Sequence, residues 1–143
     1  MPDALSDDEL AAYFALRRAS DRLTQAVTAQ LLGFGLTEVQ FTILAQLGAA
    51  SDGLPMSQLA RAITGSKSGL TYQIGKLADR GLVTRAPDID DERSIRVFLT
   101  EDGEALLEQA LPAHVSLVRD LFLQRLGDLD AATLLRALND VAA

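Results

Sequence analysis

The chain has 143 residues, 48% of them hydrophobic and 23% charged, values ordinary for one globular domain with a buried core. No apolar run is long enough to cross a bilayer, and residues 1–10 hold four acids and no base, unlike a secretory signal, so we expect a cytoplasmic protein. The absence of cysteine excludes disulfides and thiol switches, and the net charge of −7 argues at first sight against a nucleic-acid partner.

The first part of the chain is predicted to form two helices. Apolar residues spaced by threes and fours predict a helix over residues 7–32, after an acidic start. Residues 37–40 have the pattern of a capping box, in which the Thr37 hydroxyl and the Gln40 side chain each bond the other's free amide. The helix that follows, to about Leu47, is apolar over most of its girth, which is typical of a buried helix. We expect a loop over residues 49–55.

Two further helices are predicted to form a helix-turn-helix. Residues 57–63 form the first, Thr64 and Gly65 the turn, and residues 66–81 the second, with Ser66 as its cap. In the second helix one face is apolar, and the other carries side chains suited to phosphates and base edges: Ser68, Thr71, Tyr72, Lys76. An ordinary solvated helix face would have the same composition.

A hairpin is predicted directly after this helix. Residues 82–85 form one strand, residues 87–94 a polar turn, and residues 95–99 an alternating strand, after which Thr100 caps a new helix. Helix, glycine turn, helix and hairpin together make a winged helix-turn-helix, whose second helix enters the major groove of DNA.

The last part of the chain is predicted to be helical again. A long helix over residues 101–126 should kink or break near Pro112, and a last helix should follow Asp130. The apolar stripes at both chain ends exceed what a small winged domain can cover, which points to a second chain. The alternative is that they close an intramolecular bundle.

The charge of the chain is segregated. Residues 57–87 have a net charge of +4, in a chain whose net charge is −7, because they combine one acid, Asp79, with five bases: Arg61, Lys67, Lys76, Arg80, Arg85. The local field, rather than the total charge, is what meets the phosphates of DNA.

Four segments at the right order and spacing resemble the MarR family of transcriptional regulators: residues 56–60, 66–71, 77–85 and 91–103. The last contains the family's wing pattern, Asp-x-Arg followed by Val-x-Leu-Thr-x-x-Gly. The resemblance implies a mainly α fold with a small β-hairpin wing, in a single domain of residues 1–143. Within it, a winged helix-turn-helix at about 37–100 is flanked by dimerisation helices at about 7–32 and 101–143.

The polar helix face and the resemblance together predict DNA contacts. In the second helix the candidates are Ser66, Lys67, Ser68, Thr71, Tyr72 and Lys76, although Ser66 needs no DNA to act as a cap. At the wing, Arg93 resembles the family's minor-groove arginine and Asp91 the aspartate that pairs with it. Arg96 either contacts a phosphate or stays solvated. The tip is unusually acidic (Asp88, Asp90, Asp91, Glu92), which predicts a weak wing contact.

We therefore expect a ligand-responsive homodimeric repressor that binds double-stranded DNA at a pseudo-palindromic operator. The resemblance implies a cleft for small aromatic effectors, which Tyr13, Arg17, Phe34 and His114 could reach, although none of them is assigned as a ligand contact and His114 also fits an ordinary helix-surface or core position. No cofactor or metal is required. The alternative is a winged protein-interaction module that has lost DNA binding. An enzyme is not expected, because one histidine, no cysteine and scattered glycines provide few catalytic or phosphate-binding constellations.

Overall fold

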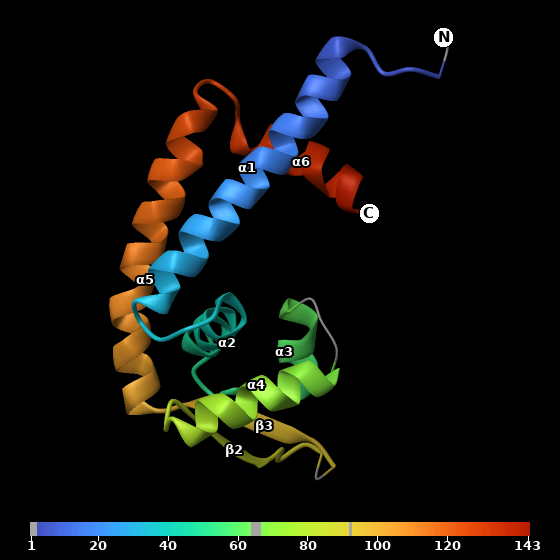
Figure 1. Ribbon diagram of the computed structural model, residues 1–143. Helices are drawn as coiled ribbons and strands as arrows, with labels where there is room; N and C mark the ends of the chain where they lie inside the picture. The colour runs from blue at the N-terminus through green and yellow to red at the C-terminus, as the bar shows by residue number, and fades with distance from the viewer. Residues whose placement is uncertain (1–2, 64–66, 92) are drawn as a thin grey trace. The chain divides into compact units, whose positions relative to one another are not determined.

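The computed structural model describes residues 3–63, 67–91 and 93–143. Its elements, shown in Figure 1, are α1 (Asp7–Leu32), α2 (Glu38–Gly48), β1 (Leu54–Pro55), α3 (Met56–Ala62), α4 (Lys67–Asp79), β2 (Val83–Pro87), β3 (Ile95–Leu99), α5 (Glu101–Leu121), a 3-10 turn η1 (Leu123–Leu126) and α6 (Ala131–Ala142). The mainly α fold with a hairpin wing is thereby confirmed. Within the described ranges, no helix combines the length and the apolar character needed to span a membrane.

The chain divides into two compact units. The winged unit comprises residues 30–113, and the helical unit comprises the N-terminal residues up to Ala29 together with residues 114–143. Both α1 and α5 therefore contribute to each unit. The organisation as one domain, with a winged region at about 37–100, stays a prediction.

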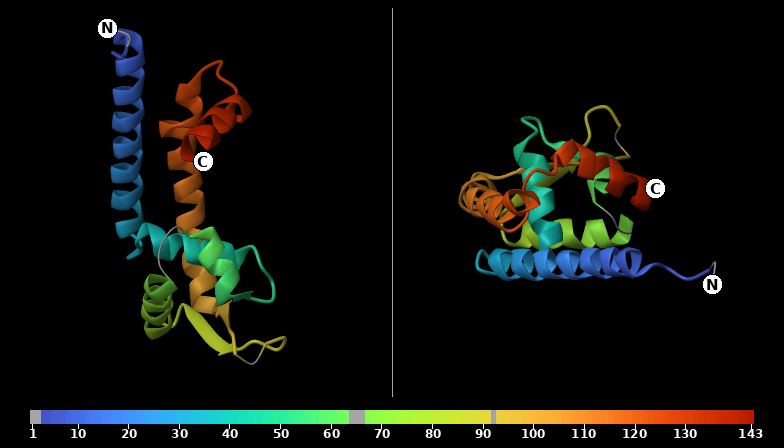
Figure 2. Two further views of the ribbon diagram at one scale, coloured as in Figure 1. Left: turned by 90° about the vertical axis from the view of Figure 1, so that its right-hand side faces the viewer. Right: turned by 90° about the horizontal axis from the view of Figure 1, so that it is seen from above.

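The winged unit contains a three-stranded antiparallel sheet with the strand order β1-β3-β2. Strand β3 pairs with β2 from Val83 opposite Leu99 to Pro87 opposite Ile95, and with β1 through Leu54 opposite Val97. The segment that joins β2 and β3 extends past the ends of these two strands (Figures 1 and 2). Strand β1 corrects the loop expected over residues 49–55; two residues are too few for alternation to reveal a strand, which only the pairing with β3 creates.

The core of the winged unit is formed by apolar side chains from both its helices and its sheet. The apolar face of α4 is buried as its sequence pattern predicts, with Leu70, Ile74 and Leu77 at most 4% exposed. Each fully buried side chain of this size stabilises the fold by about 1.5–3 kcal/mol. The largest fully buried side chains are Leu31, Ile43, Leu44, Leu47, Leu59, Ile74, Leu77, Val83 and Val97.

Capping hydrogen bonds define the start of α2 and the end of α4. The capping box of α2 is present. The Thr37 hydroxyl accepts a hydrogen bond from the backbone amide of Gln40, and the side-chain oxygen of Gln40 accepts one from the backbone amide of Thr37. Helix α4 ends in a Schellman motif, in which Leu82 N donates to Leu77 O and Gly81 N to Ala78 O. Gly81 adopts φ 73°, a conformation that a side chain would strain.

The C-terminal helices confirm one prediction and correct another. Asp130 caps α6 through a bond from the Ala132 amide to its side chain, as expected. Of the predicted kink or break near Pro112, the break is wrong, because α5 continues through Pro112 and ends only at Leu121. Pro112 is exposed, so water can bond the carbonyl that its missing N–H leaves unpaired.

Candidate nucleic-acid interface

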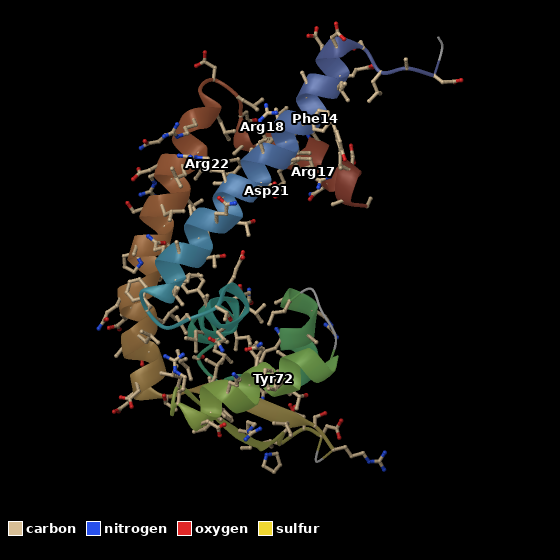
Figure 3. The ribbon with its side chains drawn as sticks, viewed as in Figure 1. Phe14, Arg17, Arg18, Asp21, Arg22 and Tyr72 are labelled. Carbon is tan, nitrogen blue, oxygen red and sulfur yellow. The ribbon has the colours of Figure 1, made fainter. Side chains whose placement is uncertain are left out.

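The outer face of α4 presents hydrogen-bonding side chains to solvent. Thr71, Tyr72 and Lys76 are all exposed, and Tyr72, labelled in Figure 3, is 60% exposed. The Lys76 ammonium lies 5.1 Å from the centre of the Tyr72 ring, within the range of a cation–π contact. This face therefore offers a hydroxyl, a phenol and an ammonium on the helix that the sequence pattern places in the major groove.

A hollow of about 420 Å³ lies between α4 and the wing. Thr71 comes to it from α4, Arg85 from β2 and Arg93 from the turn before β3. Ser57, at the start of α3, and Ser94 complete its polar lining, and the apolar remainder is Met56, Ile74 and Ile95. Two cations and three hydroxyls thus border one concave surface. The sequence pattern does not single out Arg85 as a contact, although this residue belongs to the basic segment.

Asp91 organises the backbone of the wing turn. Its carboxylate accepts from the Arg93 amide at 3.0 Å and from the Ser94 hydroxyl at 3.1 Å, and its carbonyl accepts from the Ser94 amide at 2.9 Å. Within the described residues no ion pair joins Asp91 to the Arg93 guanidinium, and Arg93 is exposed. Asp91 therefore bonds to the backbone of Arg93 and to Ser94 in the wing turn, and it does not bond to the Arg93 side chain.

Arg96 is engaged inside the winged unit. Its guanidinium lies 3.4 Å from the Asp88 carboxylate and donates to the carbonyls of Asp52 and Gly53 at 3.1 and 3.2 Å. Asp88 is 7% exposed, so this acid, one of the four expected to repel phosphates at the wing tip, is buried and paired. The geometry gives Arg96 a structural contact; its predicted phosphate contact stays a prediction.

Two polar contacts, one from α4 and one from the residue directly after it, reach the first part of the winged unit. The side-chain nitrogen of Gln40 donates to the side-chain oxygen of Gln73 at 3.1 Å, and Gln40 is 7% exposed. The Arg80 guanidinium donates to the Gly35 carbonyl at 2.6 Å. The sequence does not predict these roles for Gln73 and Arg80, because no local pattern reveals a partner more than thirty positions away.

Part of the predicted site lies outside the described residues. Ser66 and Glu92 fall there, as does the predicted turn at Thr64 and Gly65, and of Lys67 and Ser68 only the helical backbone is described. In the described part, the exposed bases of the winged unit are Arg61, Lys76, Arg80, Arg85 and Arg93. No group of three potential metal ligands occurs among the residues that the structure describes.

The paired helices α3 and α4, the hairpin beside them and this basic surface define a winged helix-turn-helix protein. A family model described as MarR family matches residues 34–94. The transcriptional repressor YetL of Bacillus subtilis is 33% identical over 129 residues, which cover 82% of this chain and 77% of YetL. The chain belongs to the MarR family of transcriptional regulators.

Solved structures agree with this assignment. AbsC, a MarR family transcriptional regulator from Streptomyces coelicolor, has 34% identity and a TM-score of 0.89, over 97% of this chain and 95% of AbsC. Sco3205 from the same organism, solved in complex with DNA, has 26% identity and a TM-score of 0.89, over 99% and 90% of the two chains. These relatives are regulators, in keeping with the expectation that the chain is not an enzyme.

Two more distant structures share the fold and belong to proteins associated with small molecules. CouR from Rhodococcus jostii is bound to p-coumaroyl-CoA, with 24% identity and a TM-score of 0.76 over 98% of this chain and 92% of CouR. DNA binding by BpsR of Bordetella bronchiseptica is regulated by 6-hydroxynicotinic acid, with 23% identity and a TM-score of 0.76 over 97% of each chain. At this identity the likeness concerns the fold alone.

Proposed function

We propose that the protein is a cytoplasmic, homodimeric, ligand-responsive repressor that binds a pseudo-palindromic operator in double-stranded DNA. The observation that carries the proposal is the concave surface on which Thr71 of α4 and Arg85 and Arg93 of the wing meet. A helix in the major groove and a wing arginine at the adjacent backbone or minor groove would bring these groups to one duplex. Ser66, Lys67, Ser68, Tyr72, Lys76, Asp91 and Arg96 complete the proposed set.

The exposure of the helical unit supports the homodimer. Among its described residues only Val27 is buried, and α6 has no buried residue at all. Large apolar side chains on α1 remain about half exposed, including Tyr13 at 48% and Phe14 at 50%. A unit with so little core is stabilised by a partner. Two-fold symmetry then predicts two half-sites about one helical turn, or roughly 10 bp, apart.

Repression and effector binding are inferred from similar proteins. YetL is named a repressor, and CouR and BpsR are described with a coenzyme A thioester and an aromatic acid. We extend repression and effector binding to this chain on that basis. An effector changes DNA binding only if it binds the DNA-competent and incompetent conformations with different affinities.

The test compares the DNA upstream of the protein's own gene with a shuffled duplex of equal length, by fluorescence anisotropy over a range of salt concentrations. We expect preferential binding to the upstream fragment and a linear fall of log affinity with log salt, because phosphate neutralisation releases counterions. Lys76→Ala should lower the affinity for both duplexes and reduce the salt slope by about one. Equal affinity for the two duplexes, or affinity indifferent to salt, would contradict the proposal.

A further inference from the structure

A second hollow of about 320 Å³ lies in the winged unit and shares no lining residue with the first. It is bordered by the C-terminal end of α2, the loop into β1, strand β3 and the first half of α5. Its lining residues are Leu47, Gly48, Ala50, Ser51, Gly53, Phe98, Leu99, Glu104, Leu107, Glu108 and Leu111. A volume of this size suits a small organic molecule.

The floor of the second hollow is apolar and its walls are partly bare backbone. Leu47 and Leu107 are 1% and 7% exposed, and Phe98 is a further lining residue whose ring lies next to Gly53. At Gly48 an added Cβ would collide with the Leu107 side chain. At Gly53, where φ is 70°, it would lie 2.5 Å from the Val97 carbonyl and 2.7 Å from the Phe98 ring. A side chain is thus excluded at Gly53, and at Gly48 it would require the end of the Leu107 side chain to shift.

The charge of the lining is of one sign. Glu104 and Glu108 stand one helical turn apart on α5, and both are exposed. All eleven lining residues are described, and none of them is basic. An aromatic ring, an aliphatic floor and two carboxylates at the rim complement a molecule that has an apolar body and a positive charge.

We propose that this hollow binds an amphipathic organic cation, such as a quaternary ammonium or a protonated amine with an aromatic body. The body would cover Leu47, Leu107 and the Phe98 ring, and the cationic head would face Glu104 and Glu108. The first hollow, which Arg85 and Arg93 border, has the opposite charge preference. Binding of the cation does not depend on the proposed operator binding, so either can fail without the other.

The test is calorimetric titration of the full-length protein with benzyltrimethylammonium. Two matched probes, benzyl alcohol and phenylacetate, keep the ring and remove or reverse the charge. The pocket variant Glu104→Gln/Glu108→Gln removes both carboxylates while preserving side-chain size. The control variant Glu101→Gln/Asp102→Asn removes two charges from the first turn of the same helix at exposed positions outside the lining.

We expect saturable binding of the cation, about tenfold weaker in the pocket variant and unchanged in the control variant, since each exposed pair contributes modestly. The neutral and anionic probes should bind at least about tenfold more weakly than the cation. Amide shifts in nitrogen-15 spectra should concentrate at Gly48, Gly53 and Phe98. Absence of saturable binding, equal weakening in both variants, or shifts confined to other segments would each overturn the proposal.

Discussion

Two of the wing arginines, Arg93 and Arg96, differ in what their guanidinium groups contact. Arg96 lies between the Asp88 carboxylate and two backbone carbonyls, with its side chain 22% exposed. Arg93 is exposed, and its backbone amide, rather than its guanidinium, bonds Asp91. Arg93 is therefore available to a duplex, whereas Arg96 would have to give up internal contacts before it could bind a phosphate.

Arg93→Ala should weaken binding to the upstream DNA fragment by about tenfold, with the largest loss at A·T-rich flanks, whose narrow minor groove attracts arginine. Fluorescence anisotropy on fragments with A·T-rich and G·C-rich flanks measures the effect. Arg119→Ala, which removes an exposed arginine from the last turn of α5 in the helical unit, is the control. Identical binding curves for the Arg93 variant and the native protein would refute the wing contact.

Arg96→Met should lower the free energy of unfolding by about 2 kcal/mol, because it leaves the buried Asp88 carboxylate without its cation. Urea unfolding at a fixed protein concentration measures the change. Adding Asp88→Asn should recover part of the loss, since the two residues form one interacting pair. If Arg96→Met leaves stability intact and reduces only DNA affinity, Arg96 is a phosphate contact after all.

At the scale of elements, the orientation of α4 depends on its apolar face and on two polar contacts. Leu70, Ile74 and Leu77 pack into the core, while the bonds to Gln40 and Gly35 add polar contacts from Gln73 and Arg80. Gln40 has two functions, because its oxygen completes the cap of α2 and its nitrogen reaches Gln73 on α4.

Gln73→Ala and Gln40→Ala should therefore destabilise the protein to different degrees. Gln73→Ala removes only the contact between the helices, at a cost of about 1 kcal/mol, whereas Gln40→Ala also removes the cap bond and costs about 1 kcal/mol more. Urea unfolding measures both. Equal losses for the two variants would mean that the cap bond of Gln40 contributes nothing measurable.

At the scale of the whole molecule, the two units differ in how much of their surface is buried. The winged unit contains every fully buried large side chain of the described chain, and the helical unit buries only Val27. Phe14→Asp should give a single subunit in sedimentation velocity and weaken operator binding, because it places a charge on the apolar surface of α1. Gln25→Asp, at an exposed polar position of the same helix, should not change the assembly. A native protein that sediments as one subunit would contradict the proposed dimer.

Elements that are marked by local periodicity and turn residues were predicted correctly, whereas elements that depend on their surroundings were not. Helix α1, the capping box of α2 and strand β3 lie where their periodicity and turn residues predict. The sequence pattern did not predict strand β1, and at Pro112 it allowed a kink or a break, where α5 is in fact unbroken. In both cases the outcome depends on surroundings, namely a pairing partner for β1 and solvent access for the carbonyl opposite Pro112.

The sequence by itself determined the winged helix-turn-helix, the polar face of α4 and the segregated positive charge, because periodicity, capping and charge are local or additive properties. Only the tertiary structure decided that Arg96 and Asp88 form an internal pair, that Arg85 joins Thr71 and Arg93 at one hollow, and that Gln73 and Arg80 hold α4. Each of these depends on contacts between segments distant along the chain, and such contacts follow from packing rather than from any pattern in the neighbouring residues.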